Sequence, residues 1–261
     1  MRALQIAATG MAAQQMRVEV ISNNLANMNT TGYNARRAEF ADLHYQQMTK
    51  PGTINAADGT VVPAGIQLGL GVRPAAISVQ LAQGPLAETG GDLDLAIEGA
   101  GYLEVTLPSG LSAYTRDGGL KRSADGLIVT TEGYQIAPGI TIPSDAKSIS
   151  INPQGEVYAY FGDRVEAELL GQISLVGFAN EKGLEATGSN LFLETAASGA
   201  ASPGTPGEDG LGVIRQNYLE GSSVDSVREV TQLIEAQRGY ELNAKVMTAA
   251  DQMMAATSQV R

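Results

Sequence analysis

The chain has 261 residues and a formal net charge of -11, a length that suits one large domain or two small ones. It contains no cysteine and one histidine, which excludes thiolate nucleophiles, disulfides and thiolate or multi-histidine metal sites. Residues 1–40 carry four arginines and two glutamates, and residues 221–261 carry four basic and five acidic side chains, so the negative charge lies between them. This acidic centre argues against nucleic acid as a partner, because phosphate binding needs clustered basic residues.

The amino-terminal sequence does not have the pattern of a membrane anchor or a secretory signal. No run of about 18 apolar residues occurs, so we expect no direct membrane insertion. Polar residues interrupt the apolar positions where a signal peptide has its core, and we expect export without a cleaved signal peptide. An organelle transit peptide is a less favoured interpretation of the same amphipathic start.

Residues 3–28 have apolar side chains at helical spacing. The stripe consists of Leu4, Met11, Val18 and Leu25 at intervals of seven, with Ile21 beside it. Asparagines and Gly32 follow, and these residue types end helices. The pattern predicts a coiled-coil-like helix about 39 Å long that ends between Asn27 and Gly32.

The carboxyl-terminal region predicts a second coiled-coil-like helix. Ser222 and Asp225 have the spacing of a capping box. The stripe that follows contains Val230, Leu233, Tyr240, Met247 and Met254. A second stripe adjoins it and contains Leu242, Val246, Ala249, Met253, Ala256 and Val260. Two adjoining stripes predict at least two neighbours. The residues alone leave open whether the terminal helices pack against copies of the chain or against each other within one domain.

Between the helices the apolar period falls to two. Residues 92–98 alternate, which predicts a half-exposed strand with Asp92 and Asp94 on one face. Further strands are predicted at residues 103–107, 127–130, 149–151, 157–161 and 173–178. Asp117-Gly118 and Asp125-Gly126 are dipeptides typical of hairpin turns. The fold class is therefore mainly β with terminal α-helices: an antiparallel all-β central domain between N- and C-terminal coiled-coil-like helices.

Two segments lack a periodic pattern. Residues 196–212 are rich in small residues and proline, and we expect a flexible loop. Residues 46–70 contain Pro51, Gly52, Pro63 and Gly65 and are long for a plain connection, which favours a functional segment. Ile66 and Leu68 provide apolar side chains within it.

No constellation for catalysis, cofactor binding or metal binding emerges. Asp92 and Asp94 could be the paired carboxylates of a secreted carbohydrate-active β enzyme, but a solvated strand face is the more economical interpretation. His44 has no partner in the pattern and is expected to be a surface or linker histidine. No phosphate-binding loop or nucleophile elbow occurs. We therefore predict no enzyme activity, no cofactor and no metal.

The amino-terminal helix leads into a long, specific motif that resembles the signature of bacterial flagellar rod and hook proteins, the axial family. The signature residues are Ser22, Asn23, Asn24, Leu25, Ala26, Asn27, Asn29, Thr30, Gly32 and Tyr33; Asn34 stands where the family commonly has lysine. The segments 93–99, 114–118, 218–225 and 235–243 resemble other motifs of the family, so the likeness extends over nearly the whole chain.

The resemblance implies a structural subunit of a helical tube that contains an export channel and transmits torque. It implies four regions: the N-terminal helix of the inner tube domain (1–32), an extended linker with a rod-specific loop at 46–70 (33–75), a β-rich outer domain (76–215) and the C-terminal helix of the inner tube domain (216–261). Subunit packing falls to Leu4, Met11, Val18, Ile21 and Leu25 and to the stripe from Val230 to Met254.

The implied partners are identical subunits, proximal rod proteins, the hook or its junction, the surrounding basal-body rings and the flagellar type III export apparatus. The implied location is the periplasm-spanning rod of the basal body. Length and residues 46–70 favour the distal part of the rod, and a proximal rod or hook subunit is the nearest alternative.

Overall fold

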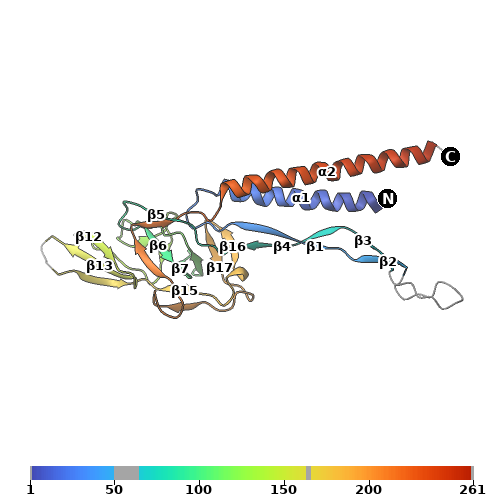
Figure 1. Ribbon diagram of the computed structural model, residues 1–261. Helices are drawn as coiled ribbons and strands as arrows, with labels where there is room; N and C mark the ends of the chain where they lie inside the picture. The colour runs from blue at the N-terminus through green and yellow to red at the C-terminus, as the bar shows by residue number, and fades with distance from the viewer. Residues whose placement is uncertain (1, 50–64, 163–165, 260–261) are drawn as a thin grey trace. The chain divides into compact units, whose positions relative to one another are not determined.

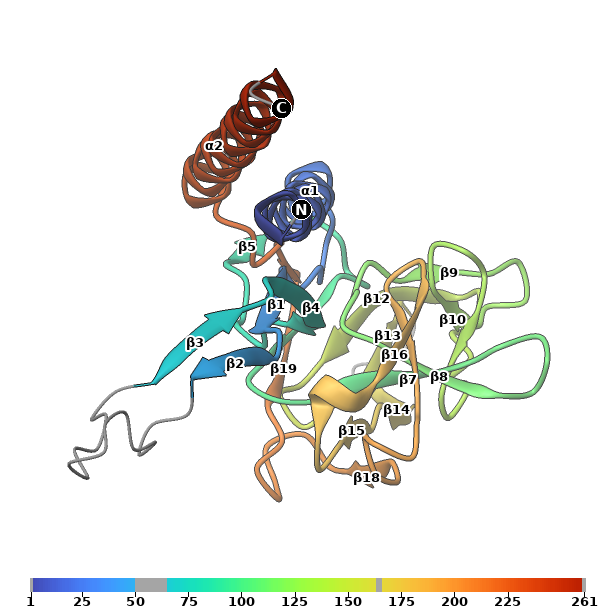
Figure 2. The same ribbon diagram turned by 90° about the vertical axis from the view of Figure 1, so that its right-hand side faces the viewer.

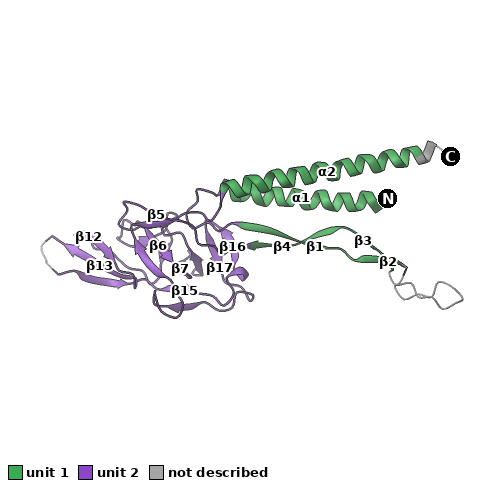
Figure 3. Ribbon diagram, viewed as in Figure 1, with its two compact units in different colours: residues 1–25, 36–78, 226–261 green, residues 26–35, 79–225 purple. Residues whose placement is uncertain are grey.

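The computed structural model describes residues 2–49, 65–162 and 166–259. The chain divides into two compact units (Figure 3): unit 1 comprises residues 1–25, 36–78 and 226–261, and unit 2 comprises residues 26–35 and 79–225. The described part contains a helix near each end and mainly antiparallel strands, which confirms the predicted fold class. Each unit is built from segments that are distant in the sequence.

Unit 1 consists of two helices and two small β-ladders (Figure 1). Helix α1 is Arg2–Ala26 and helix α2 is Ser226–Gln259. Strand β1 (Arg36–Asp42) pairs with β4 (Val72–Val79), and β2 (Tyr45–Thr49) pairs with β3 (Ile66–Gly69). The β2–β3 ladder is antiparallel, with Gln47 opposite Gln67. Most of the described part of residues 46–70 is therefore strand, and Pro51, Gly52 and Pro63 lie outside the described residues.

The ends of the two helices differ in how well local sequence predicts them. Helix α1 ends at Ala26 and a turn leads to Gly32, whose φ of +64° suits glycine, so the predicted stop is confirmed. The capping box at Ser222 is wrong, because α2 begins four residues later, at Ser226. The Ser222 hydroxyl accepts a hydrogen bond from the Val224 amide instead, at 3.3 Å, within the turn before the helix.

Unit 2 is built around a nine-stranded antiparallel sheet. Its path runs β16 (Glu185–Gly188), β17 (Leu191–Leu193), β8 (Ser112–Thr115), β7 (Tyr102–Thr106), β11 (Gln135–Ile136), β10 (Ile128–Val129) and β9 (Lys121–Arg122), and β15 (Leu175–Gly177) joins β7 to β18 (Ser202–Gly204). Smaller sheets are β12 (Ala146–Ile151), β13 (Glu156–Phe161) and β14 (Glu168–Gln172); β6 (Leu95–Glu98) with β19 (Val213–Gln216); and β5 (Leu86–Glu88) with β20 (Tyr218–Glu220). A short 3-10 helix spans Glu181–Gly183.

The central strands of unit 2 are buried on both faces. Alternate residues of β7, such as Leu103 and Val105, enter an aliphatic core, whereas Tyr102 points to the other face. There Tyr102 and Tyr114 pack edge to face against Phe178, with ring centroids 5.9 and 4.8 Å apart. The chain has few aromatic residues, and several of them lie together on this face, where their burial contributes to stability.

The structure of unit 2 corrects three sequence predictions. Strand β6 begins only at Leu95, and its first three residues are all buried, so residues 92–98 do not form a half-exposed strand. Asp117-Gly118 is not a hairpin turn, because the flanking strands β8 and β9 do not pair with each other. Asp125-Gly126 does link β9 to β10 as predicted. Residues 196–212 are not a plain loop, because they include β18 and the fully buried Ser198.

Candidate functional site

The two helices of unit 1 contact each other through small and polar side chains. A side chain at Gly10 would lie 2.9 Å from Asn243 Nδ2, and one at Gly239 would lie 3.1 Å from Gln14 Cδ. Arg17 forms an ion pair with Glu235 at 3.4 Å. Residues later in α1 contact residues earlier in α2, so the two helices are antiparallel. The sequence left open whether the terminal helices pack against each other, and within this chain they do.

Helix α2 also carries large apolar side chains that unit 1 leaves exposed. The exposed set is Val227, Val230, Ile234, Leu242, Val246 and Met253. At 100° per residue, Val227, Val230 and Ile234 lie across the helix from Ala236, Gly239 and Asn243. The others lie within about 60° of Gly239, at the edge of the side that faces α1. A helix in an isolated protein would turn such residues inward, so these exposed side chains, the outer face of α2, have the composition of an interface.

The predicted packing residues are distributed over several environments. Ile21 is buried, whereas Leu4, Met11, Val18 and Leu25 are half-buried. On α2, Leu233 and Met247 are half-buried, and the exposed ones are Val230, Tyr240 and Met254. Subunit packing by these residues stays a prediction.

Asn24 links three segments of unit 1 and is 1% exposed. Its Nδ2 donates to the Arg36 carbonyl at 2.8 Å and to Glu229 Oε2 at 3.1 Å, and its Oδ1 accepts from the Arg36 amide at 2.9 Å. The side chain thus satisfies backbone groups at the start of β1 and a carboxylate on α2. Ser22 and Asn23, its neighbours in the signature, are exposed.

The rest of the signature, from Ala26 to Tyr33, belongs to unit 2 and is bonded into it. The Gly32 amide donates to the Glu220 carbonyl at 2.8 Å, and the Tyr33 carbonyl accepts from the Ser223 amide at 3.0 Å. The Thr31 hydroxyl donates to Asp117 Oδ1 at 2.8 Å. A side chain at Gly32 would meet the backbone of Arg116 at 2.9 Å, which explains a glycine there. Within the motif, Asn27 Oδ1 accepts from Thr30, and Asn29 is exposed.

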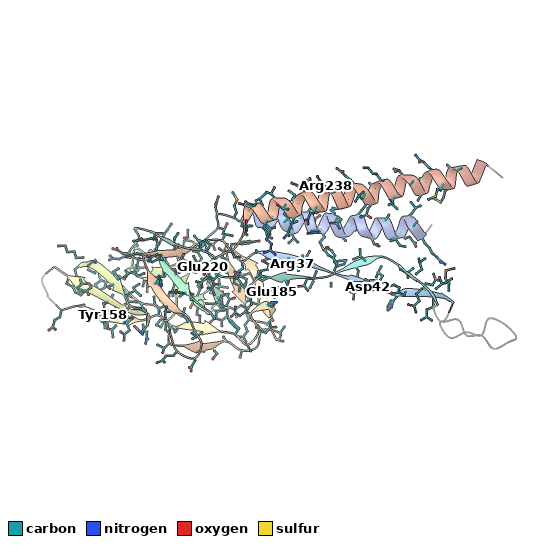
Figure 4. The ribbon with its side chains drawn as sticks, in the orientation of Figure 1. Arg37, Asp42, Tyr158, Glu185, Glu220 and Arg238 are labelled. Carbon is teal, nitrogen blue, oxygen red and sulfur yellow. The ribbon has the colours of Figure 1, made fainter. Side chains whose placement is uncertain are left out.

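A buried ion pair lies beneath this segment (Figure 4 labels Glu220). Arg116 Nε donates to Glu220 Oε2 at 3.0 Å, with side-chain exposures of 8% and 3%. The remaining guanidinium donors reach the carbonyls of Gly99 and Gly101, and Glu220 Oε1 accepts from the Gly84 amide. Both charges are therefore paired and hydrogen-bonded, the condition under which burial of charge is tolerated.

Three models of known protein families match separate parts of the chain. Family models described as Flagella basal body rod protein, Flagellar hook protein FlgE/F/G D1 domain, and Flagellar basal body rod FlgEFG protein C-terminal match residues 4–34, 96–159 and 215–260. The Flagellar basal-body rod protein FlgG of Caulobacter vibrioides is 52% identical over 261 residues, covering 100% of both chains. That of Agrobacterium fabrum is 49% identical over 259 residues, covering 99% of each.

The chain belongs to the flagellar basal-body rod protein family.

In this rod protein the first family match covers α1 and the segment bonded into unit 2, and the last covers β20 and α2. Arg116 and Glu220, which form the buried ion pair, lie in the segments 114–118 and 218–225 that carried the resemblance. The sequence pattern alone does not predict that these two residues pair. The sequence patterns do not identify the partners of Asn24, because Arg36 is 12 positions away and Glu229 is 205, both beyond the reach of helical or strand periodicity.

The rod protein offers no support for paired catalytic carboxylates. Asp94 Oδ2 accepts from the Thr89 hydroxyl at 2.6 Å, whereas Asp92 is exposed in a turn. His44 is exposed between β1 and β2. In the described ranges no cluster of three metal-ligating side chains occurs, and no helix there has the length and hydropathy needed to cross a membrane. Burial, with the adjacent Glu181 carboxylate, raises the pKa of the Tyr102 hydroxyl, which donates to that carboxylate.

Proposed function

We propose that this chain is a mechanical, non-catalytic subunit of the distal rod that polymerises with identical copies into a helical tube. The observation that carries the proposal is the outer face of α2, where large apolar residues are exposed while small and polar ones face α1. Packing that face against other copies would remove it from water, at about 25 cal/mol per Å². The tube would enclose the export channel and transmit torque to the hook.

The proposed partners follow from the same role. They are proximal rod subunits, the hook or its junction, the surrounding basal-body rings and the type III export apparatus, which would deliver the chain without signal cleavage. Amino-terminal sequencing of the chain from purified basal bodies checks the last point. A shortened amino terminus would contradict export without cleavage.

Charge on the outer face tests the proposal directly. Val246 is 50% exposed, so Val246→Asp should leave the folded chain as stable as the wild type but prevent polymerisation and motility. Leu111→Asp is the matched control, because Leu111 is exposed at the β7–β8 turn of unit 2 and belongs to neither helix. Thermal unfolding and electron microscopy of purified rods are the measurements. Normal rods from Val246→Asp would contradict the proposal.

We further propose that the rod-specific segment bridges copies through β3. Its ladder with β2 has only two strands, which is marginal in water by itself, and it exposes Tyr45, Met48, Ile66 and Leu68. Ile66→Asp or Leu68→Asp should yield flexible or unstacked rods. Gln67→Asp places the same charge on the other face of the strand and should give straight rods. Electron microscopy is the measurement. Rods of the same straightness from all three variants would contradict the bridging role.

A further inference from the structure

We propose that Thr9 and Asn24 are positioning residues that hold the arm, defined as residues 36–49 and 65–78, along helix α1. The inference rests on the proposed bridging role of this arm, since a bridge between copies needs a defined direction. Figure 2, which looks nearly along α1, places β1 and β4 beside that helix, and Figure 1 shows the β2–β3 ladder beyond them, toward the amino-terminal end of α1. The evidence is a set of side-chain-to-backbone contacts at the two ends of the β1–β4 ladder.

The first anchor is at the carboxyl-terminal end of α1. The Asn24 amide group bonds both backbone groups of Arg36, the first residue of β1, as donor at 2.8 Å and as acceptor at 2.9 Å. Such paired bonds copy the pattern of a neighbouring strand and fix the point at which the arm leaves. The Glu229 carboxylate holds the same amide from the α2 side.

The second anchor is near the amino-terminal end of α1. Thr9 Oγ1 donates to the Ile6 carbonyl at 2.8 Å and accepts from the Val72 amide, the start of β4, at 3.3 Å. Gly71 has a φ of +120°, and a side chain there would lie 2.2 Å from Thr9 Oγ1. The Leu43 amide donates to the Gly71 carbonyl at 2.8 Å, so this anchor engages both sides of the arm.

The spacing of the anchors fits a helix and a strand side by side. From Thr9 to Asn24 the helix rises about 22 Å, and the two residues differ by about 60° around its axis. From Arg36 to Leu43 an extended strand covers about 23 Å. The two lengths match, so the ladder can follow α1 between the anchors without slack. The β2–β3 ladder then continues from the second anchor in a fixed direction.

Spin labels can measure this direction, because the chain has no cysteine of its own. Ala12→Cys on α1 and Gln67→Cys on β3 replace exposed residues and give one labelled pair in the full-length, unassembled chain. Pulsed electron–electron resonance should give one narrow distance peak for the otherwise wild-type chain. Thr9→Val, which keeps the shape but removes the hydroxyl, and Asn24→Ala should lose that peak.

Two controls separate positioning from general damage. Thr9→Ser keeps the hydroxyl and should restore the narrow peak. Ser78→Ala removes an exposed hydrogen bond to Glu39 in the same ladder and should leave the peak unchanged. A broad wild-type distribution, or a narrow one in the Thr9→Val and Asn24→Ala chains, would overturn the proposal. Because no polymer is needed, this result is independent of whether Val246→Asp or Ile66→Asp affects rods.

Discussion

At the scale of single residues, the buried Arg116–Glu220 pair is the most vulnerable point of unit 2. Glu220→Gln would leave the guanidinium buried without a carboxylate, and we expect a loss of about 3–5 kcal/mol in the free energy of unfolding. Glu98→Gln breaks the exposed ion pair with Arg215 and should cost less than about 1 kcal/mol. Denaturant titrations followed by circular dichroism compare the two. Similar losses would contradict the distinction between buried and exposed pairs.

Tyr102 predicts a pH dependence at the same scale. Because burial raises the pKa of its hydroxyl, the folded state favours the neutral phenol. The stabilisation of the folded state by the neutral phenol is complete below the pKa of tyrosine in the unfolded chain, about 10, and is lost as the pH rises above that value. The stability of the wild type should therefore fall more steeply above pH 10 than that of Tyr102→Phe. Parallel stability curves would show that Tyr102 is not responsible.

At the scale of elements, glycine sets how closely α1 and α2 approach. Gly239→Leu would gain about 1 kcal/mol of helix propensity but would force a large side chain onto Gln14, costing about 1–3 kcal/mol. We expect the helical signal to melt at a lower temperature in this variant. Ala249→Leu, on the exposed side of α2, should not lower the melting temperature. A higher melting temperature for Gly239→Leu would mean that the helices do not meet closely there.

At the scale of the whole molecule, the signature segment should behave as part of unit 2 even when its peptide bonds to unit 1 are cut. Trypsin sites at Arg17 and Arg37 lie on either side of the signature segment, and Arg228 follows the second piece of unit 2. After cleavage, the peptide that contains residues 26–35 should remain bound through Gly32, Tyr33 and Thr31 and should co-elute with the β fragment in gel filtration. A peptide that elutes separately from the β fragment would show that these contacts do not hold the segment in unit 2.

Much of this protein could be predicted from short-range patterns. The heptad spacing of Leu4 to Leu25 and of Val230 to Met254 predicts both helices, and Gly32 predicts the stop of the first. Alternation around Leu103 and Val157 predicts the strands, and the long signature predicts the family. These features depend on neighbours a few residues apart, whose side chains share a face whatever the rest of the chain does.

The tertiary structure alone decided which surfaces meet. The apolar stripes do not show that α2 turns Gly239 and Asn243 toward α1 and keeps Val246 exposed. Residues 92–98 alternate as a half-exposed strand does, but two-sided burial of β6 cancels that prediction. Asn24 finds Arg36 and Glu229, and Arg116 finds Glu220, only after folding brings separate segments together. Periodicity records which side chains are apolar, whereas the choice of partner depends on contacts between residues far apart in the chain.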